Sequence, residues 1–378
     1  MDQEAETKWN KGKLVLFIFC TAISLCLVSS CSAVQNYSAS IKHVHLQKKK
    51  AVNKWKLPMS IPEGEFFEAS GWLTSNQILF ITNKEQTSNL YSYDLITGKN
   101  ILLFHSNAPI VTVDVSPEKK YILIHSSPST DKGDVTIIDQ KGSKVWNLSI
   151  PSFELDFEWN PYNESQMVVT KFNEDWTFQV YQLDIAKKGF EPLLVPQPFI
   201  EWMSRNTIAY LNLDQNHQSL FGPLIKSHLS PLDGQMIFQK VYQFSAFKNL
   251  LMTITVNDQD KTKAIYSFFD SKLNSVMSFS IPQLTKYSDW LVPFYDFNTA
   301  KNQFITFRPL RSTSFDSYTE GFQLVSYGMK SGKSEILFKD LENSPIISSP
   351  SGNACLYGNR LEKIIDFKNK KIFSLLKE

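Results

Sequence analysis

Cysteine is scarce, and its positions exclude a fold held together by disulfide bonds. The chain of 378 residues has four cysteines, of which Cys20, Cys26 and Cys31 lie in the first 31 residues. Only Cys355 lies beyond them, so the main body of the chain can form no internal disulfide. Because Cys355 stands between Ala354 and Leu356, we expect it to be a buried, inert thiol.

An excess of charge of one sign is also missing, and so are the common catalytic motifs. The 39 basic residues nearly balance the 37 acidic ones, which argues against a nucleic-acid-binding protein. With 14 Gly and 17 Pro, collagen-like and low-complexity classes are excluded. The sequence has no G-x-S-x-G, H-E-x-x-H or C-x-x-C motif and no phosphate-binding loop. We therefore expect no cofactor and no metal site, and we do not expect an enzyme.

A long apolar run is present once, at the N-terminus. Residues 14–30 are apolar and follow three lysines, as in a secretory signal peptide. The run ends in Val28-Ser29-Ser30-Cys31, which resembles a bacterial lipobox. This pattern predicts that residues 1–30 are removed and that the Cys31 thiol carries a diacylglycerol, with palmitate as an acyl chain. Two acyl chains would give stable membrane attachment.

Two alternatives to a lipid anchor remain open for this segment. The run is just long enough to serve as an uncleaved transmembrane anchor, and the chain could also be cleaved and released. All three interpretations place the rest of the chain outside the cytoplasm. We expect it at the outer face of the cell membrane.

A basic tether is expected after the signal. Residues 31–62 contain six lysines, His43 and His45, and no acidic residue. The segment has no hydrophobic periodicity, so it should stay extended, either as a solubilising spacer or held against anionic head groups or wall polymers. The two histidines alone make a poor metal site.

Residues 63–378 show the repeat of a β-propeller. Short apolar strands recur every 40 to 53 residues, which suits blades of four strands. Turns such as Asp94 to Gly98 and Asp139 to Gly142 follow them, and Trp72, Trp159 and Trp202 precede them. The spacing predicts an all-β propeller of seven blades. If the irregular fourth unit joins the fifth, the count is six.

The quoted features resemble a known family. The lipobox, the basic tether, residues 71–82, residues 90–98 and the segment Tyr121 to Thr130 are similar to YqgU-like β-propeller lipoproteins of Gram-positive bacteria. The resemblance implies a lipid-anchored propeller, and the family is described as six-bladed. It implies no site residue beyond Cys31.

Two groups of residues are candidates for ligand binding. Asp114, Glu158, Glu201 and Asp289 each end an expected innermost strand, so they could surround one mouth of the central channel and bind a cation or a basic group. Alternatively, each carboxylate caps its own turn.

The second candidate is the long loop 308–320 of the sixth unit. It holds Arg308 and Arg311, two of only four arginines in the chain, among aromatic residues. His125 could act as a base, but a buried structural histidine is the simpler interpretation.

The sequence therefore predicts a membrane-anchored, extracytoplasmic binding module for an envelope protein, a peptide or a wall polymer. A hydrolase or lyase working in the channel, and a structural assembly factor without a small ligand, are the alternatives.

Overall fold

The computed structural model describes residues 55–213, 219–256, 259–287 and 289–377. The predicted signal peptide, Cys31 and most of the predicted tether lie outside these residues. Within the described part of the chain, no helix has the length and apolar character needed to cross a membrane.

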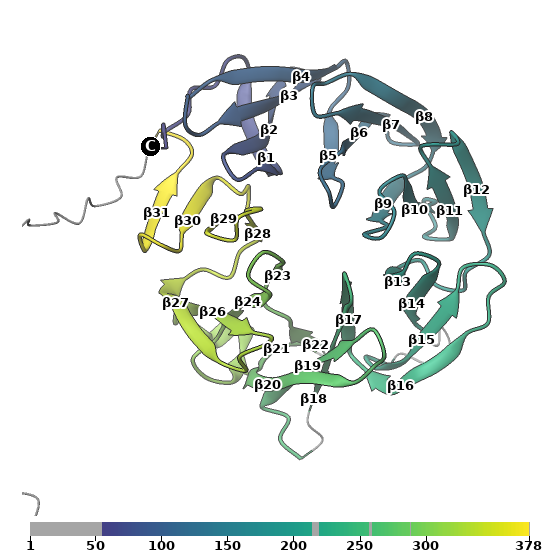
Figure 1. The fold of residues 1–378 in the computed structure, drawn as a ribbon, viewed down its shortest axis with the longest axis vertical. Helices are drawn as coiled ribbons and strands as arrows, with labels where there is room; N and C mark the ends of the chain where they lie inside the picture. Colours follow the sequence, from purple (N-terminus) through teal and green to yellow (C-terminus); the bar gives the residue numbers. More distant parts are fainter. Residues whose placement is uncertain (1–54, 214–218, 257–258, 288, 378) are drawn as a thin grey trace, which may run out of the picture. The chain divides into compact units, whose positions relative to one another are not determined.

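Seven four-stranded antiparallel sheets, in which each strand pairs with the next, are arranged in a ring around a central axis (Figure 1). The count agrees with the seven units predicted from the repeat. We number the sheets as blades 1 to 7 along the chain. In blades 1 to 3 the strands are β1 Glu65–Thr74, β2 Gln77–Lys84, β3 Thr87–Asp94, β4 Asn100–Ser106; β5 Ile110–Val115, β6 Tyr121–Ser129, β7 Lys132–Asp139, β8 Lys144–Pro151; β9 Glu154–Trp159, β10 Gln166–Phe172, β11 Phe178–Asp184, β12 Gly189–Leu193.

Blades 4 to 7 follow the same plan. Their strands are β13 Glu201–Ser204, β14 Thr207–Leu211, β15 Gly222–His228, β16 Gln235–Val241; β17 Gln243–Phe247, β18 Leu250–Val256, β19 Lys263–Asp270, β20 Ser275–Pro282; β23 Tyr295–Asn298, β24 Gln303–Arg308, β26 Phe322–Gly328, β27 Ser334–Leu341; β28 Ile346–Ser348, β29 Ala354–Tyr357, β30 Lys363–Asp366, β31 Lys371–Ser374. A small extra sheet contains β22 Asp289–Leu291, β21 Leu284–Lys286 and β25 Thr313–Ser314. Its strands β21 and β22 lie between the fifth and sixth blades in sequence, whereas β25 lies in the loop between β24 and β26 and is followed by the 3-10 helix η1 Phe315–Ser317.

The second strand of each blade is apolar because neighbouring blades cover both of its faces. In β2, the five residues from Ile78 to Thr82 are all buried. The turns form as the sequence predicts: the Asp94 carboxylate accepts hydrogen bonds from the N–H groups of Ile96 and Thr97, and Gly98 has a positive φ of 74°. Continuous apolar runs and Asp-Gly turns therefore mark the blades directly in the sequence.

Seven apolar clusters hold the ring together, one at each junction between neighbouring blades. The cluster that closes the ring joins Trp72 and Phe80 of blade 1 to Leu356 and Ile364 of blade 7. The indole N–H of Trp72 donates a hydrogen bond to the Ile347 carbonyl oxygen at 3.0 Å across the same junction. Among the described strands, none from one end of the chain completes the blade of the other, so side-chain packing and hydrogen bonds between blades 1 and 7 close the ring.

Residues 55–62 pack against this closing junction. The Met59 N–H donates to the Leu375 carbonyl oxygen at 2.7 Å, and the Met59 side chain is only 5% exposed. The Lys56 N–H donates to the Leu95 carbonyl oxygen at 2.6 Å. We call this segment the clasp, because it contacts both the first and the last blade.

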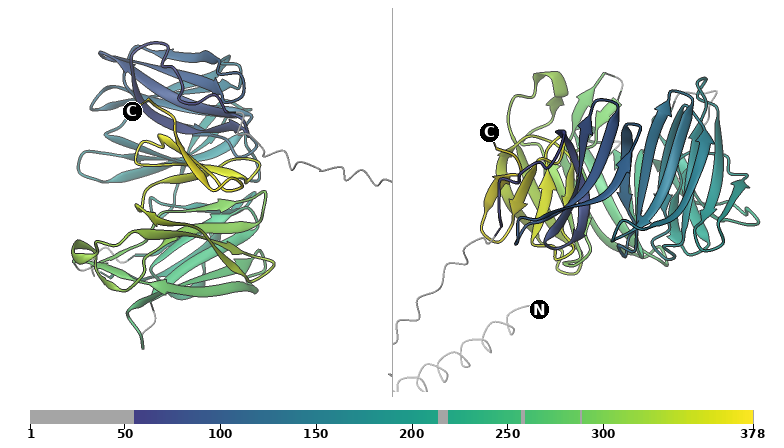
Figure 2. Two further views of the ribbon diagram at one scale, coloured as in Figure 1. Left: turned by 90° about the vertical axis from the view of Figure 1, so that its left-hand side faces the viewer. Right: turned by 90° about the horizontal axis from the view of Figure 1, so that it is seen from above.

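The two faces of the disc carry different connections. One face, the turn face, holds the links between the first and second and between the third and fourth strands of each blade. The other, the linker face, holds the links between second and third strands and those between blades. The loop that contains η1 stands out from the linker face (Figure 2).

Candidate functional site

The innermost strands of the ring carry acidic side chains and no basic ones. These strands are β1, β5, β9, β13, β17, β23 and β28, which lie nearest the centre of the ring in Figure 1 and so surround the expected channel. Their sequences contain eight acidic residues and no Lys or Arg. The acidic residues are Glu65 and Glu68 in β1, Asp114 in β5, Glu154, Asp156 and Glu158 in β9, Glu201 in β13 and Asp296 in β23. Such a lining creates a negative field inside the channel.

Asp114 and Glu158 come close together because blades 2 and 3 are neighbours. Burial raises the pKa of Asp114 to about 6, helped by the charge of Asp156 and opposed by the Val115 N–H and Lys119. Burial also raises the pKa of Glu158 well above its usual value, with repulsion from Glu201, Asp114 and Asp156 adding to it. The structure thus brings together three of the four predicted acids.

Glu201 lies in blade 4 and binds across to blade 5. Its carboxylate accepts a hydrogen bond from the Ala246 N–H. Burial raises its pKa to about 7, while the hydrogen bonds from Ala246 and Ser245 act in the opposite direction. The Ser245 hydroxyl lies 2.8 Å from the Tyr295 hydroxyl, which extends this polar network to blade 6. Glu201 therefore joins two blades as well as lining the channel.

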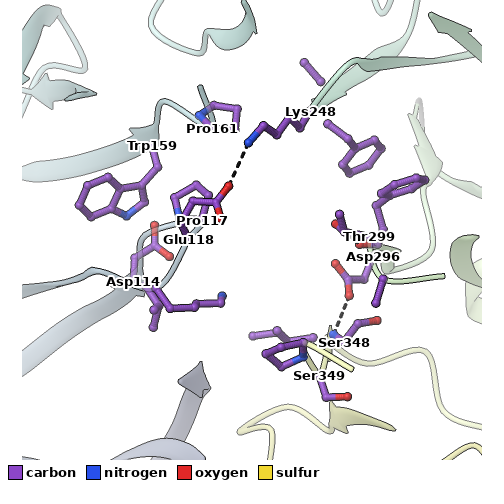
Figure 3. Close-up of a pocket in the computed structure, with 18 of the residues that line it drawn as sticks. Asp114, Pro117, Glu118, Trp159, Pro161, Lys248, Asp296, Thr299, Ser348 and Ser349 are labelled. Atoms are coloured by element: carbon purple, nitrogen blue, oxygen red, sulfur yellow. Dashed lines mark hydrogen bonds and ion pairs between the residues drawn. The ribbon is translucent and has the colours of Figure 1, made fainter. Parts of the chain in front are cut away.

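A cavity of about 710 Å³ opens where the channel meets the turn face (Figure 3). Asp114, Glu158, Asp296 and Lys119 line it, together with Trp159 and other turn-face residues. The Lys248 ammonium lies 2.9 Å from Glu118, and Asp296 accepts a hydrogen bond from the Ser348 N–H at 2.6 Å. Burial lowers the pKa of Lys119, and the charges of Asp114 and Asp296 oppose this shift.

The predicted position of Asp289 was wrong. Asp289 begins β22 of the extra sheet and accepts a hydrogen bond from the Tyr242 hydroxyl, away from the innermost strands. The innermost strand of blade 6 is β23, and its acid is Asp296. The error arose because Asp289-Trp290 imitates the Glu-Trp pairs of blades 3 and 4. The apolar strand β24 begins at Gln303, and counting back from it by the spacing in blade 2, where Asp114 precedes the start of β6 at Tyr121, would have given Asp296.

Arg308 and Arg311 bind residues of their own blade. Arg308 ends β24, and its guanidinium donates to the Gln323 side-chain oxygen at 2.6 and 3.2 Å. Arg311 pairs with Glu320 at 2.6 Å within the exposed loop. The loop is ordered by this pair and by the parallel pairing of β25 with β21. Ligand binding by the two arginines remains a prediction.

The remaining candidate side chains lie inside the blades. His125 is 6% exposed in β6 and packs edge-on against Phe157, and burial lowers its pKa. Cys355 is buried in β29, and burial raises its pKa. Within the described ranges, no three His, Cys, Asp or Glu side chains are grouped as metal ligands would be.

The linker face carries a feature that the sequence reasoning missed. Among the residues that the structure describes, twenty large hydrophobic side chains are exposed; ten of them lie in linker-face connections and two in turn-face connections. The ten are Phe153, Trp176, Leu194, Phe199, Leu213, Leu220, Tyr287, Phe294, Leu310 and Phe315. Single exposed apolar residues are normal, but their concentration on one face is typical of an interaction surface.

An aromatic group forms the best-defined part of this surface. Trp176 stands at the tip of the β10–β11 hairpin with a positive φ of 63° and is 61% exposed. Its ring contacts Phe153 and Phe172, both with centroids 5.9 Å away, and Phe172 contacts Phe199 at 5.7 Å. Leu194, in the same inter-blade link as Phe199, is 90% exposed. The hairpin Phe172–Trp176 and the links on both sides of blade 3 thus build one aromatic patch.

Comparisons with solved structures identify the fold. The uncharacterized protein lmo1340 from Listeria monocytogenes EGD-e has a TM-score of 0.77 and 26% identity, over 84% of this chain and 96% of that chain. An oligogalacturonate lyase from Vibrio parahaemolyticus reaches a TM-score of 0.55 at 10% identity, over 79% of this chain and 87% of that chain. At this low identity, the second likeness concerns the fold alone.

Sequence comparison identifies the family. The uncharacterized lipoprotein YqgU of Bacillus subtilis (strain 168) is 29% identical over 320 residues, which cover 85% of this chain and 86% of the relative. The model of the YqgU-like 6-bladed beta propeller domain matches residues 94–358, from the end of β3 to the end of β29. The family description gives six blades, whereas the described residues of this chain form seven four-stranded sheets. The chain belongs to the YqgU-like β-propeller family.

Proposed function

We propose that this protein is a membrane-anchored binding module that uses its linker face to bind an envelope protein. The anchor is the lipid on Cys31, on the outer side of the membrane. The lipoprotein name of the Bacillus subtilis relative and the Val28-Ser29-Ser30-Cys31 motif support this part of the proposal.

The concentration of exposed apolar side chains on the linker face carries the proposal. Aromatic residues are enriched in protein interfaces because they bury a large area at a small cost in conformational entropy. Trp176 and Phe199 meet these conditions, since their rings are exposed and held by neighbouring aromatic rings. A rigid disc with a ring of loops presents such side chains without rearrangement.

The charge of the linker face indicates the chemistry of the partner. Its described connections contain ten acidic residues and four basic ones. The acidic residues include Glu174 and Asp175, which precede Trp176 on the hairpin. A partner with basic and apolar side chains fits this surface, because a cation can lie over the indole ring while the carboxylates balance its charge.

The acidic channel would add a site for a positively charged group of a ligand. Asp114, Glu158 and Glu201 would hold that group, and ion pairing would relieve their mutual repulsion. The absence of Lys and Arg from the innermost strands supports this part of the proposal.

Chemical cross-linking of living cells that carry the tagged protein, followed by mass spectrometry, tests the linker face. We expect one reproducible envelope partner. Its capture should fall about tenfold or more in a Trp176→Ala, Phe199→Ala double variant, because central aromatic anchors dominate interface energy.

The matched control is the Ile96→Ala, Leu232→Ala variant, which removes the two exposed hydrophobic residues of the turn-face connections. Capture should be unchanged in this variant. Equal capture by both variants, or no specific partner with the unmodified protein, would contradict the proposal. Thermal melting of each variant shows whether the domain stays folded.

A further inference from the structure

The turn face has a charge opposite to that of the linker face. Its connections contain 14 basic and three acidic residues. The basic residues come from turns of all seven blades and are Lys99, Lys119, Lys120, Lys141, Lys187, Lys188, Arg205, Lys248, Lys272, Lys301, Lys330, Lys333, Lys368 and Lys370. The acidic residues are Glu118, Glu164 and Asp233. The ring as a whole, and no single blade, creates the basic surface.

Most of these basic side chains are free to meet a ligand. All except Lys119 are exposed. Only Lys187, Lys248 and Lys370 pair with a described carboxylate, at 3.9, 2.9 and 3.4 Å. The other exposed basic side chains form no close ion pair with another described residue, so their ammonium and guanidinium groups are available to a ligand.

The aspartates at the ends of the third strands do not reverse this charge. Asp94, Asp139, Asp184, Asp270 and Asp366 lie at the turn face, and hydrogen bonds from the N–H groups of their own turns occupy them. If they are included, the basic residues still outnumber the acidic ones by 14 to eight. The turn face therefore keeps a net positive charge.

The described domain begins on the side of the turn face. Lys56 in the clasp donates its N–H to the Leu95 carbonyl oxygen, in the turn between β3 and β4. The Lys56 side chain also lies against Gly98 of that turn. The clasp then runs to Met59, which binds Leu375 after β31. The described domain therefore begins, at residue 55, beside the basic surface.

We propose that the turn face lies on the surface of an anionic lipid bilayer, the same membrane to which the chain is anchored. This inference rests on the membrane anchoring proposed above. Basic residues close to an anionic membrane surface bind it with about 1 kcal/mol each, and a flat ring of turns can present many of them together. The anchored chain keeps this face near the lipid, so each contact forms at high local concentration. In this orientation the linker face points away from the membrane.

Hydrogen exchange of the anchored full chain on vesicles tests the orientation. The probe is a phosphatidylcholine vesicle with or without about a third of phosphatidylglycerol, because the attraction requires anionic lipid. On the anionic vesicle, amides of turns 271–274 and 329–333 should exchange several-fold more slowly. Amides of the linker-face segments 173–177 and 309–321 should exchange equally on both vesicles.

A pair of charge variants provides the control. In Lys272→Glu, Lys330→Glu the protection should be lost, since removing two basic residues alone weakens attraction about 30-fold. In Lys261→Glu, Lys286→Glu, which changes two exposed lysines of the linker face, the protection should remain.

Three other results would overturn the orientation. The first is equal exchange on both vesicles, and the second is protection of the linker face. The third is protection by soluble polyphosphate without protection by lipid, which would assign the basic surface to a soluble or wall polyanion. Sedimentation of the chain with the vesicles separates these results from a failure of the anchor, because an unanchored chain would not sediment with neutral vesicles.

Discussion

Single carboxyl groups show most clearly how position determines chemistry in this molecule. Asp94 and Glu201 are both acidic, yet hydrogen bonds from its own turn lower the pKa of Asp94, whereas burial raises that of Glu201 to about 7. The first residue is a turn cap and stays ionised at neutral pH. The second is desolvated in the fold, so its ionisation costs folding free energy and its protonation state affects the stability of the domain.

The pH dependence of stability should therefore depend on Glu201. A raised pKa in the folded state means that the folded chain binds the proton more tightly than the unfolded chain. The resulting stabilisation is complete below about pH 4 and is lost as the pH rises through about 7. In Glu201→Gln, the amide oxygen can still accept a hydrogen bond from the Ala246 N–H. This variant should reduce the change in unfolding free energy across this pH range by about 2 kcal/mol.

Chemical denaturation at pH 5 and pH 8 measures the effect. The difference in unfolding free energy between Glu201→Gln and the unmodified protein should favour the variant more at pH 8 than at pH 5. Glu191→Gln, on the exposed outer strand β12, is the control and should show the same stability difference at both pH values. An identical pH profile for Glu201→Gln and the unmodified protein would show that this carboxyl group is not desolvated.

At the scale of elements, the clasp is the segment whose role the sequence hid. Residues 55–62 have the composition of a tether, with Lys56 and two prolines and no periodic apolar pattern. Their packing depends on partners that are distant in sequence: Leu95 lies 39 residues after Lys56, and Leu375 lies 316 residues after Met59. Local sequence patterns do not predict contacts between residues so far apart, so the role of this segment could be found only from the structure.

Removing the Met59 side chain should weaken the closing junction. Met59 is buried among Trp72, Tyr93 and Leu375, so Met59→Ala leaves a cavity and should cost about 2–4 kcal/mol of unfolding free energy. Urea denaturation measures this cost. Met236→Ala, at a position that is 57% exposed in β16, is the matched control and should cost less than about 1 kcal/mol. Equal costs would mean that the clasp contributes nothing to closure.

The blades themselves could be predicted because their signals are local. Apolar second strands such as β2 and β6 and the turns after Asp94 and Asp139 repeat with nearly constant spacing. The sixth blade departs from this repeat, because the extra strand β22 precedes it and carries an Asp-Trp pair like the Glu-Trp pairs of the innermost strands β9 and β13. The candidate site was therefore predicted for blades 2, 3 and 4 and misplaced in blade 6.

The described domain is a disc with three regions of different charge, and none of them is visible in the chain's net charge of +2. The turn face is basic, the channel is acidic, and the linker face is acidic and apolar. A basic surface toward the membrane and an apolar surface away from it would allow lipid and partner to bind at the same time. The cavity at the channel mouth opens on the turn face, so lipid contact would also restrict access to Asp114 and Glu158.

High salt should separate the two kinds of binding in one sample. The Debye length falls from about 10 Å at 0.1 M to about 3 Å at 1 M salt, which screens attraction between exposed lysines and anionic lipid. Slow exchange of turns 271–274 and 329–333 on anionic vesicles should therefore disappear at 1 M salt. Contacts of Trp176 and Phe199 bury apolar surface and should persist, so partner capture should be largely retained. If salt instead abolished capture and left the turn face protected, the assignment of lipid to one face and protein to the other would have to be reversed.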